Sequence, residues 1–133
     1  MNSMTEMTEI FGEPISIYTR RQAIEDGALV DLMQPETAGL VREAGFKFPI
    51  AMTIAAWTAA IGPVGKPLPD GQDLQGRLWD VLWMLKCTIH AGAAGDRLAF
   101  TVKVGRKLVR LWSQCGPGDD AEPVITIMLP GED

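Results

Sequence analysis

The segment from Asp73 to Gly92 carries apolar residues on two opposite sides of a predicted helix. At about 100° per residue, one broad stripe is aliphatic and matches an ordinary core-facing helix. A second stripe lies nearly opposite and is aromatic, where a helix with one buried side would carry charges. Such a helix must either lie between two layers or present its aromatic stripe to a partner. The aliphatic stripe is Leu74, Leu78, Val81, Leu82, Leu85 and Ile89, and the aromatic stripe is Trp79, Trp83 and His90 with Lys86 at its edge.

The chain has 133 residues, which is the size of one compact domain and enough to bury a core. Its hydrophobic share of 47% and charged share of 22% are those of a globular protein rather than a disordered chain. The segment Met1–Gly12 has few large apolar residues and no clear period. We therefore predict a flexible tail over residues 1–12 and a single α+β domain over residues 13–133.

Capping and stop residues divide the N-terminal half into short elements. Thr19 can cap a helix that Gly27 ends in the left-handed conformation, and Thr53 can cap another. Proline suits a first helical position, and a later glycine would end that helix. The predicted elements are a strand over Ile15–Tyr18, a helix over Arg20–Asp26, an extended segment over Ala28–Met33, a helix from Pro35 to Gly45, extended backbone over Phe46–Pro49 and a helix from Thr53 to Ile61.

The C-terminal half has a clearer pattern. Leu98–Val104 alternates in polarity, and Lys107–Gln114 follows after the pair Gly105-Arg106, which suits a type II′ hairpin. Val124–Leu129 provides a further strand. The hairpin register gives one apolar core face and one amphipathic face. The core face is Leu98, Phe100, Val102, Val104, Val109 and Leu111, and the opposite face is Thr101, Lys103, Leu108, Arg110 and Trp112.

These elements together predict an α+β fold. An antiparallel sheet of about three C-terminal strands packs on the long central helix, and the N-terminal half contributes short strand and helix segments. Residues 62–71, which are rich in Pro and Gly, form a loop rather than a domain boundary.

Charge and hydropathy exclude several classes of protein. The net charge of −5 and pI near 4.8 make direct nucleic-acid binding an unfavoured function, because that binding needs clustered Lys and Arg. The longest mostly apolar stretch, Pro49–Ile61, is shorter than the roughly 20 residues that span a bilayer, and the first residues lack a secretion signal. Cys87 and Cys115 do not form a disulfide framework. We therefore expect a cytoplasmic protein that makes no membrane contact and has reduced thiols.

A first candidate site is an anion-binding site at Tyr18, Thr19, Arg20 and Arg21. Two arginines in a first helical turn oppose the helix dipole, so they could hold an anion or phosphate at the helix start. The alternative is that Arg21 pairs with Glu25 one turn later, while Arg20 is solvated.

A second candidate is the acidic loop with Asp119, Asp120 and Glu122. Three carboxylates could bind a hard cation or contact a basic protein surface. However, the spacing matches no metal-binding signature, and Gly, Pro and Asp are ordinary residues of a strand connection. We therefore expect a solvated loop and assign no metal ligand and no cofactor.

A third candidate is the pair Cys87 and His90, which lie three residues apart on the predicted helix and could act as nucleophile and base. No orienting group or oxyanion donor accompanies them, so helix packing is the favoured explanation. We therefore assign no catalytic residue.

Exposed tryptophans are strong interface anchors, so the aromatic residues are candidates for an interaction surface. The alternative is that the helix around Trp57 covers them, as a second packed layer would. The candidate interaction residues are Trp79, Trp83, His90, Arg110 and Trp112.

Four runs together resemble a family of short uncharacterised bacterial proteins associated with plasmids, phages and integrative elements. This resemblance implies no activity, but it raises the expectation of a small protein that binds host machinery. The residues Tyr18–Leu32 are also similar to the opening of ADP-ribosyltransferases, although the histidine that often precedes such openings is absent. The four runs are Tyr18–Gly27, Glu43–Pro49, Leu78–Leu85 and Cys115–Val124.

Two functions remain open on these grounds. The first is a small cytoplasmic protein-binding module without catalytic activity, which acts as an accessory factor or modulates host machinery, or which self-associates through the aromatic stripe. The second is a nucleotide- or NAD-linked transferase that uses the anion site at Tyr18–Arg21.

Overall fold

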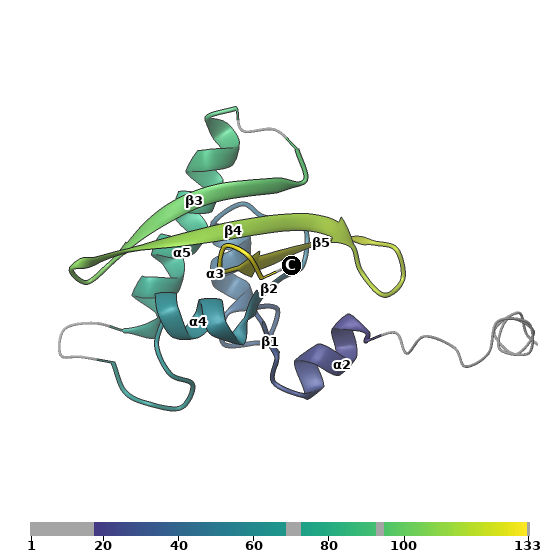
Figure 1. The fold of residues 1–133 in the computed structure, drawn as a ribbon, viewed down its shortest axis with the longest axis horizontal. Helices are drawn as coiled ribbons and strands as arrows, with labels where there is room; N and C mark the ends of the chain where they lie inside the picture. The colour runs from purple at the N-terminus through teal and green to yellow at the C-terminus, as the bar shows by residue number, and fades with distance from the viewer. Residues whose placement is uncertain (1–17, 69–72, 93–94, 133) are drawn as a thin grey trace, which may run out of the picture.

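A five-stranded sheet with helices packed against it forms the fold, in a computed structural model that describes residues 18–68, 73–92 and 95–132 (Figure 1). The strand order is β1-β2-β5-β4-β3. The elements are α2 (Arg20–Glu25), β1 (Leu29–Asp31), α3 (Ala38–Glu43), β2 (Ile50–Thr53), α4 (Ile54–Ala60), α5 (Leu74–His90), β3 (Arg97–Val104), β4 (Lys107–Pro117) and β5 (Pro123–Met128).

The mixed helix and strand content is as predicted, but the sheet is larger than the three C-terminal strands that the sequence suggested. β1 and β2 of the N-terminal half extend it to five strands, and β2 pairs with β5 in parallel. The residues Ile50, Ala51 and Met52 are all buried, so β2 has no alternation of polarity to reveal it. The C-terminal strands β3, β4 and β5 do pair antiparallel as expected, but the expectation of a sheet of about three strands was wrong.

The long helix is confirmed. α5 has 17 residues, and the carboxylate of Asp73 caps it by accepting a hydrogen bond from the Gly76 N–H. Figure 1 shows α5 behind the sheet, crossing β3 and β4. The aliphatic stripe is fully buried in the middle turns of the helix but partly exposed at its two ends. The buried members are Leu78, Val81, Leu82 and Leu85, and the exposed members are Leu74 and Ile89.

The hairpin register is also confirmed. Val104 pairs with Lys107 across a two-residue turn, and Val102 and Phe100 pair with Val109 and Leu111 on the core side. Gly105 has φ of +60° at the first centre of the turn, while Arg106 has no positive φ, as a type II′ turn requires. One side of the hairpin therefore packs on α5, and its other side faces outward.

The predicted caps are present, although two element boundaries differ from those predicted. Thr19 forms a capping box with Gln22, and the Thr53 hydroxyl accepts a hydrogen bond from the Ala56 N–H. The helix expected from Pro35 begins only at Ala38, because turns precede it and the Thr37 hydroxyl donates to the Leu32 carbonyl at 2.7 Å. The expected Ala28–Met33 segment is a strand only over Leu29–Asp31. Residues 1–12, and all but the last residue of the predicted Ile15–Tyr18 strand, lie outside the described residues.

None of the helices in the described ranges is both long enough and apolar enough to cross a bilayer.

We expect Ile127→Ala in the central strand β5 to lower the free energy of unfolding by about 2–5 kcal/mol, because its side chain is fully buried in the main core. Leu108→Ala is the control, since Leu108 is 75% exposed and its truncation should change stability by less than about 0.5 kcal/mol. Chemical denaturation of both variants measures the difference. Equal stabilities would contradict the position of β5 in the core.

Candidate functional site

The aromatic stripe of α5 forms a stacked pair of indoles. The ring centroids of Trp79 and Trp83 lie 5.8 Å apart, and their planes differ by 14°. Trp79 is half-buried and packs against the main core, whereas Trp83 is 49% exposed. Residues four apart on a helix lie on the same side of it, which brings the two rings together. The stack is thus anchored at one ring and open to solvent at the other.

A helix around Trp57 does exist, but it leaves this stripe partly open. Trp57 lies on α4 and is itself buried in the main core. Cover by that helix was one of two expectations, and it is wrong for Trp83, whose ring remains half-exposed. The fold therefore accounts for the burial of Trp79 but not for an aromatic residue at position 83.

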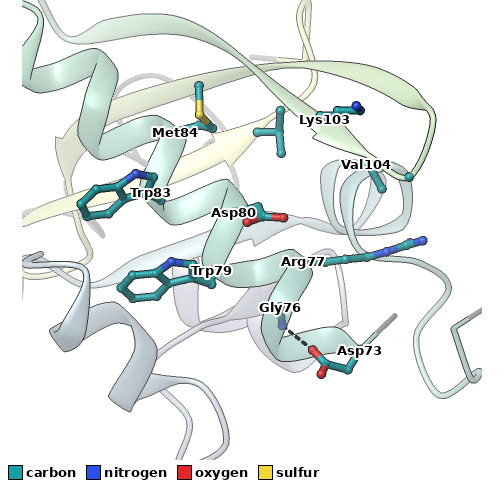
Figure 2. Close-up of a pocket in the computed structure, with 11 residues that line it drawn as sticks. Asp73, Gly76, Arg77, Trp79, Asp80, Trp83, Met84, Lys103 and Val104 are labelled. Carbon is teal, nitrogen blue, oxygen red and sulfur yellow. Dashed lines mark hydrogen bonds between the residues drawn. The ribbon is translucent and has the colours of Figure 1, made fainter. Parts of the chain in front are cut away.

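An open groove of about 760 Å³ adjoins the indole stack (Figure 2). Its lining comes from the first half of α5 and from the end of β3 before the hairpin turn. Figure 2 shows the two indoles on one side of α5, with Met84 directed toward β3 and Asp80 pointing away from the indoles. Its lining includes Trp79, Asp80, Trp83, Met84, Val102, Lys103 and Val104.

The groove lies at a sheet edge rather than beneath the sheet. β3 is the last strand in the order, so one of its sides has no neighbouring strand among the described elements. The groove is lined by Val102 and Val104 of β3, whereas β4 contributes no lining residue. A partner in this groove would therefore contact a helix side and a strand edge together.

The remaining interaction candidates lie elsewhere. Trp112 pairs with Ala99 and faces the outer side of the hairpin, opposite the side that packs on α5. The guanidinium of Arg97 lies 4.7 Å from the Trp112 ring centroid, and Arg110 is exposed on the same side. His90 and Cys87 are exposed at the C-terminal end of α5. The structure thus brings Trp79 and Trp83 together but separates them from Trp112 and Arg110.

The candidate anion site and the acidic loop meet each other. The Asp119 carboxylate accepts hydrogen bonds from the backbone N–H groups of Arg20 at 2.8 Å and Arg21 at 3.0 Å. These bonds lower the pKa of Asp119, because they stabilise its charged form. The chain's own carboxylate therefore takes the position at the start of α2 that an external anion would need.

The side chain of Arg20 is used for packing across the sheet. Its guanidinium donates to the Thr126 hydroxyl at 2.7 Å and to the Ile125 carbonyl at 3.0 Å. Partial burial lowers the pKa of this guanidinium, and nearby carboxylates, led by Asp31, act in the opposite direction. This side chain therefore joins α2 to strand β5, and solvation of Arg20 was the wrong expectation.

The other groups near α2 also have partners within the chain. The Tyr18 hydroxyl donates to the Asp26 carboxylate at 2.8 Å, which raises the pKa of that phenol. Arg21 and Glu25 form no ion pair, although their spacing would allow one. The Glu122 carboxylate accepts a hydrogen bond from the Asp120 N–H at 2.9 Å. Across the described ranges, no group of three or more His, Cys, Asp or Glu side chains could hold a metal ion.

A second cavity of about 450 Å³ opens on the other flank of α5. Cys115, which is half-buried, lines it together with Phe46 and Lys86. The Lys86 ammonium lies 5.4 Å from the Phe46 ring centroid and donates to the Gly45 carbonyl at 3.1 Å. This cation therefore holds the loop before β2 against the helix.

The residues of β3 in the groove were missed as site residues by sequence reasoning. Val102 and Val104 were assigned to the core face of the hairpin, which is correct, but their position at a sheet edge depends on strand order. Met84 gave a signal, because it is a large apolar residue outside both stripes of α5. Met84 is 38% exposed and lines the groove, which explains why a large apolar residue lies outside both stripes.

Comparisons with known proteins give one match. A family model described as "Family of unknown function (DUF6573)" matches residues 1–133. No curated protein and no solved structure matches the chain.

We expect Trp57→Ala and Trp83→Ala to differ in their cost to stability. Trp57 is 6% exposed, so its truncation should lower the free energy of unfolding by about 3–5 kcal/mol. Trp83 is 49% exposed, so its truncation should cost about 1 kcal/mol or less. Thermal and urea unfolding of both variants tests this, and a large loss for Trp83→Ala would mean that another part of the chain covers the ring.

We expect Asp119→Asn to lower stability in a pH-dependent way. The folded-state pKa of Asp119 lies below its ordinary value of 3.8, so its contribution is present above that value and is lost as pH falls through the folded pKa. The stability difference between wild type and Asp119→Asn should therefore shrink in acid. Asp120→Asn is the matched control, because the Asp120 side chain makes no hydrogen bond to the described residues. A difference that is constant with pH would contradict the contact with α2.

Proposed function

This chain belongs to the DUF6573 family of unknown function, and we propose that it is a small protein-binding module without catalytic activity. Its docking surface is the groove between α5 and β3, with Trp79 and Trp83 at one side. The partner is a protein of the host machinery, on which this chain acts as an accessory or modulating factor.

The stacked and half-exposed Trp83 carries this proposal. An indole offers a large contact area with few rotatable bonds, so it loses little conformational entropy when a partner covers it. The stack on Trp79 orients the ring before binding and holds it at the groove. Met84 adds a second exposed apolar side chain on the same helix. A ready-made aromatic anchor beside an open groove is the arrangement that protein interfaces use.

The setting of the chain is part of the same proposal. The resemblance to proteins of plasmids, phages and integrative elements supports a role on a mobile genetic element. The two cysteines are free, and Cys87 is exposed, which suits the reducing cytoplasm.

The alternative of a nucleotide- or NAD-linked transferase has no specific observation in its favour. A phosphate at the start of α2 would have to displace Asp119 from two backbone N–H groups. Arg20 is also occupied with Thr126 and Ile125. Calorimetric titration with NAD tests this directly, because heat of binding that depends on Arg20 and Arg21 would favour the transferase.

We expect Trp83→Ala to abolish recovery of a specific partner when the tagged chain is purified from its bacterial host. Leu108→Ala is the control, because it removes an even more exposed apolar side chain from outside the groove. The same proteins should be recovered with wild type and with the control. Partners that remain with Trp83→Ala, or light scattering that shows a dimer broken by Trp79→Glu, would contradict binding of a host protein at this groove.

A further inference from the structure

We propose that the groove binds an extended segment of the partner in which apolar and acidic side chains alternate, and that this segment adds as a sixth strand to the edge of β3. This inference rests on the proposed function and names the chemistry of its ligand. Addition of a strand to a sheet edge is a general mode of peptide recognition, in which backbone hydrogen bonds supply affinity and alternate side chains supply specificity.

The backbone of β3 has unpaired groups directed toward the groove edge. In a hairpin with a two-residue turn, Val104 and Lys107 exchange both backbone hydrogen bonds, and every second pair repeats this pattern. The Cys115 N–H donates to the Asp96 carbonyl at 2.7 Å, which fits that alternation. The N–H and C=O groups of Ala99, Thr101 and Lys103 therefore point away from β4.

These groups are not used elsewhere in the part of the chain that the structure describes. The hydrogen bonds made outside the strands and helices include none to the backbone of Ala99, Thr101 or Lys103. Unpaired edge groups of this kind form a template for another strand. With eight residues, β3 is long enough to pair with a typical strand.

The two sides of an added strand would meet different surfaces. Residues opposite Val102 and Val104 would face the α5 side, where Met84 and the indole stack line the groove. Residues opposite Thr101 and Lys103 would face the outer side of the hairpin, which is amphipathic and carries basic side chains beside Leu108 and Trp112. Because side chains alternate along a strand, the matching segment carries apolar residues at one set of positions and a different type at the other.

Charge selects acidic residues for that second set. The segment from residue 97 to residue 118 holds five cationic residues and no acidic one, although the whole chain has a net charge of −5. All five are exposed, and three of them lie on the outer side of the hairpin. Opposite charges placed on neighbouring strands stabilise their pairing. The three are Arg97, Lys103 and Arg110, and the other two are Arg106 and Lys107 at the turn.

The same charges disfavour a second copy of this chain as the occupant. A two-fold antiparallel pairing of β3 centred on Phe100 would place Arg97 of one copy opposite Lys103 of the other. Like charges directly opposite each other destabilise a sheet. Lysine on an edge strand is also a common means of preventing self-association.

A nucleic acid fits this surface less well than a peptide does. Bases bind open sheet faces by stacking on exposed aromatic rings. Trp112 is the one aromatic residue on the outer side of the hairpin, and Arg97 already lies over its ring at 4.7 Å. The unpaired backbone groups of β3 match a peptide backbone instead.

A synthetic peptide of about ten residues, in which valine and glutamate alternate, tests the proposal on the full chain. NMR titration should show binding with slowed amide exchange at Ala99, Thr101 and Lys103. Two control peptides should bind at least about tenfold more weakly, because each loses several interactions of the pairing. One has the same composition with its glutamates grouped at one end, and the other is N-methylated at alternate positions so that it cannot pair.

Protein variants then locate the site. Thr101→Pro removes an outward N–H and leaves the pairing with β4 intact, since proline is tolerated at such edge positions. It should weaken peptide binding at least about tenfold, whereas Thr101→Val, which keeps the N–H, should not. Should Thr101→Pro fail to fold, Lys103→Glu takes its place, with Lys47→Glu as a control at an exposed position outside the groove.

Several outcomes would overturn the inference. These are no peptide binding at about millimolar concentration, equal binding of the N-methylated peptide, protection of the same amides by a dimer, and binding of an oligothymidine in place of the peptide. Failure of the inference differs from failure of the proposed function. A host partner lost with Trp83→Ala but kept with Thr101→Pro would leave the docking surface in place and exclude strand addition.

Discussion

The parallel pairing of β2 with β5 is the interaction on which the rest of the structure depends. Ile50 pairs with Ile125, Ala51 with Thr126 and Met52 with Ile127. A short strand of the N-terminal half therefore lies beside the last strand of the chain. The Ile125 N–H also donates to the Pro49 carbonyl at 2.9 Å. This pair joins β1 and β2 to the three C-terminal strands and so makes one sheet from both halves of the chain. It also brings Arg20 within reach of Thr126 and the start of α2 within reach of Asp119.

The two sides of α5 are used for different purposes. The aliphatic side packs into the core between the sheet and the shorter helices, and this burial supplies stability in proportion to the apolar area removed from water. The indole of Trp83 is stacked on Trp79 but remains half-exposed, so it contributes little to the core. An aromatic ring there is therefore better explained by a contact outside the chain.

Local patterns predicted the parts of the fold that depend on near neighbours. Thr19, Asp73 and Gly105 identified two caps and one turn, and the alternation of residues 98–111 predicted the hairpin register. Strand β2 could not be predicted in this way, because it is buried on both faces and pairs with a strand far along the chain. The contact between Arg20 and Asp119 spans 99 residues, so the sequence presented as two candidate sites what the fold joins into one contact. The stripes of α5 likewise predicted that two rings would meet but not whether another layer would cover them.

The charge distribution explains how an open strand edge can resist pairing with a second copy of the chain. A long edge strand with an apolar groove beside it would pair with other copies of itself unless something opposed that pairing. Lys103 and Arg97 on β3 oppose it, because they repel the same residues of a second copy. The repulsion depends on the sign of the incoming charge, so a strand that carries glutamate or aspartate is attracted by the same side chains that exclude a copy. On the proposed mode of binding, one set of cations would therefore provide both protection from self-association and selectivity for an acidic partner.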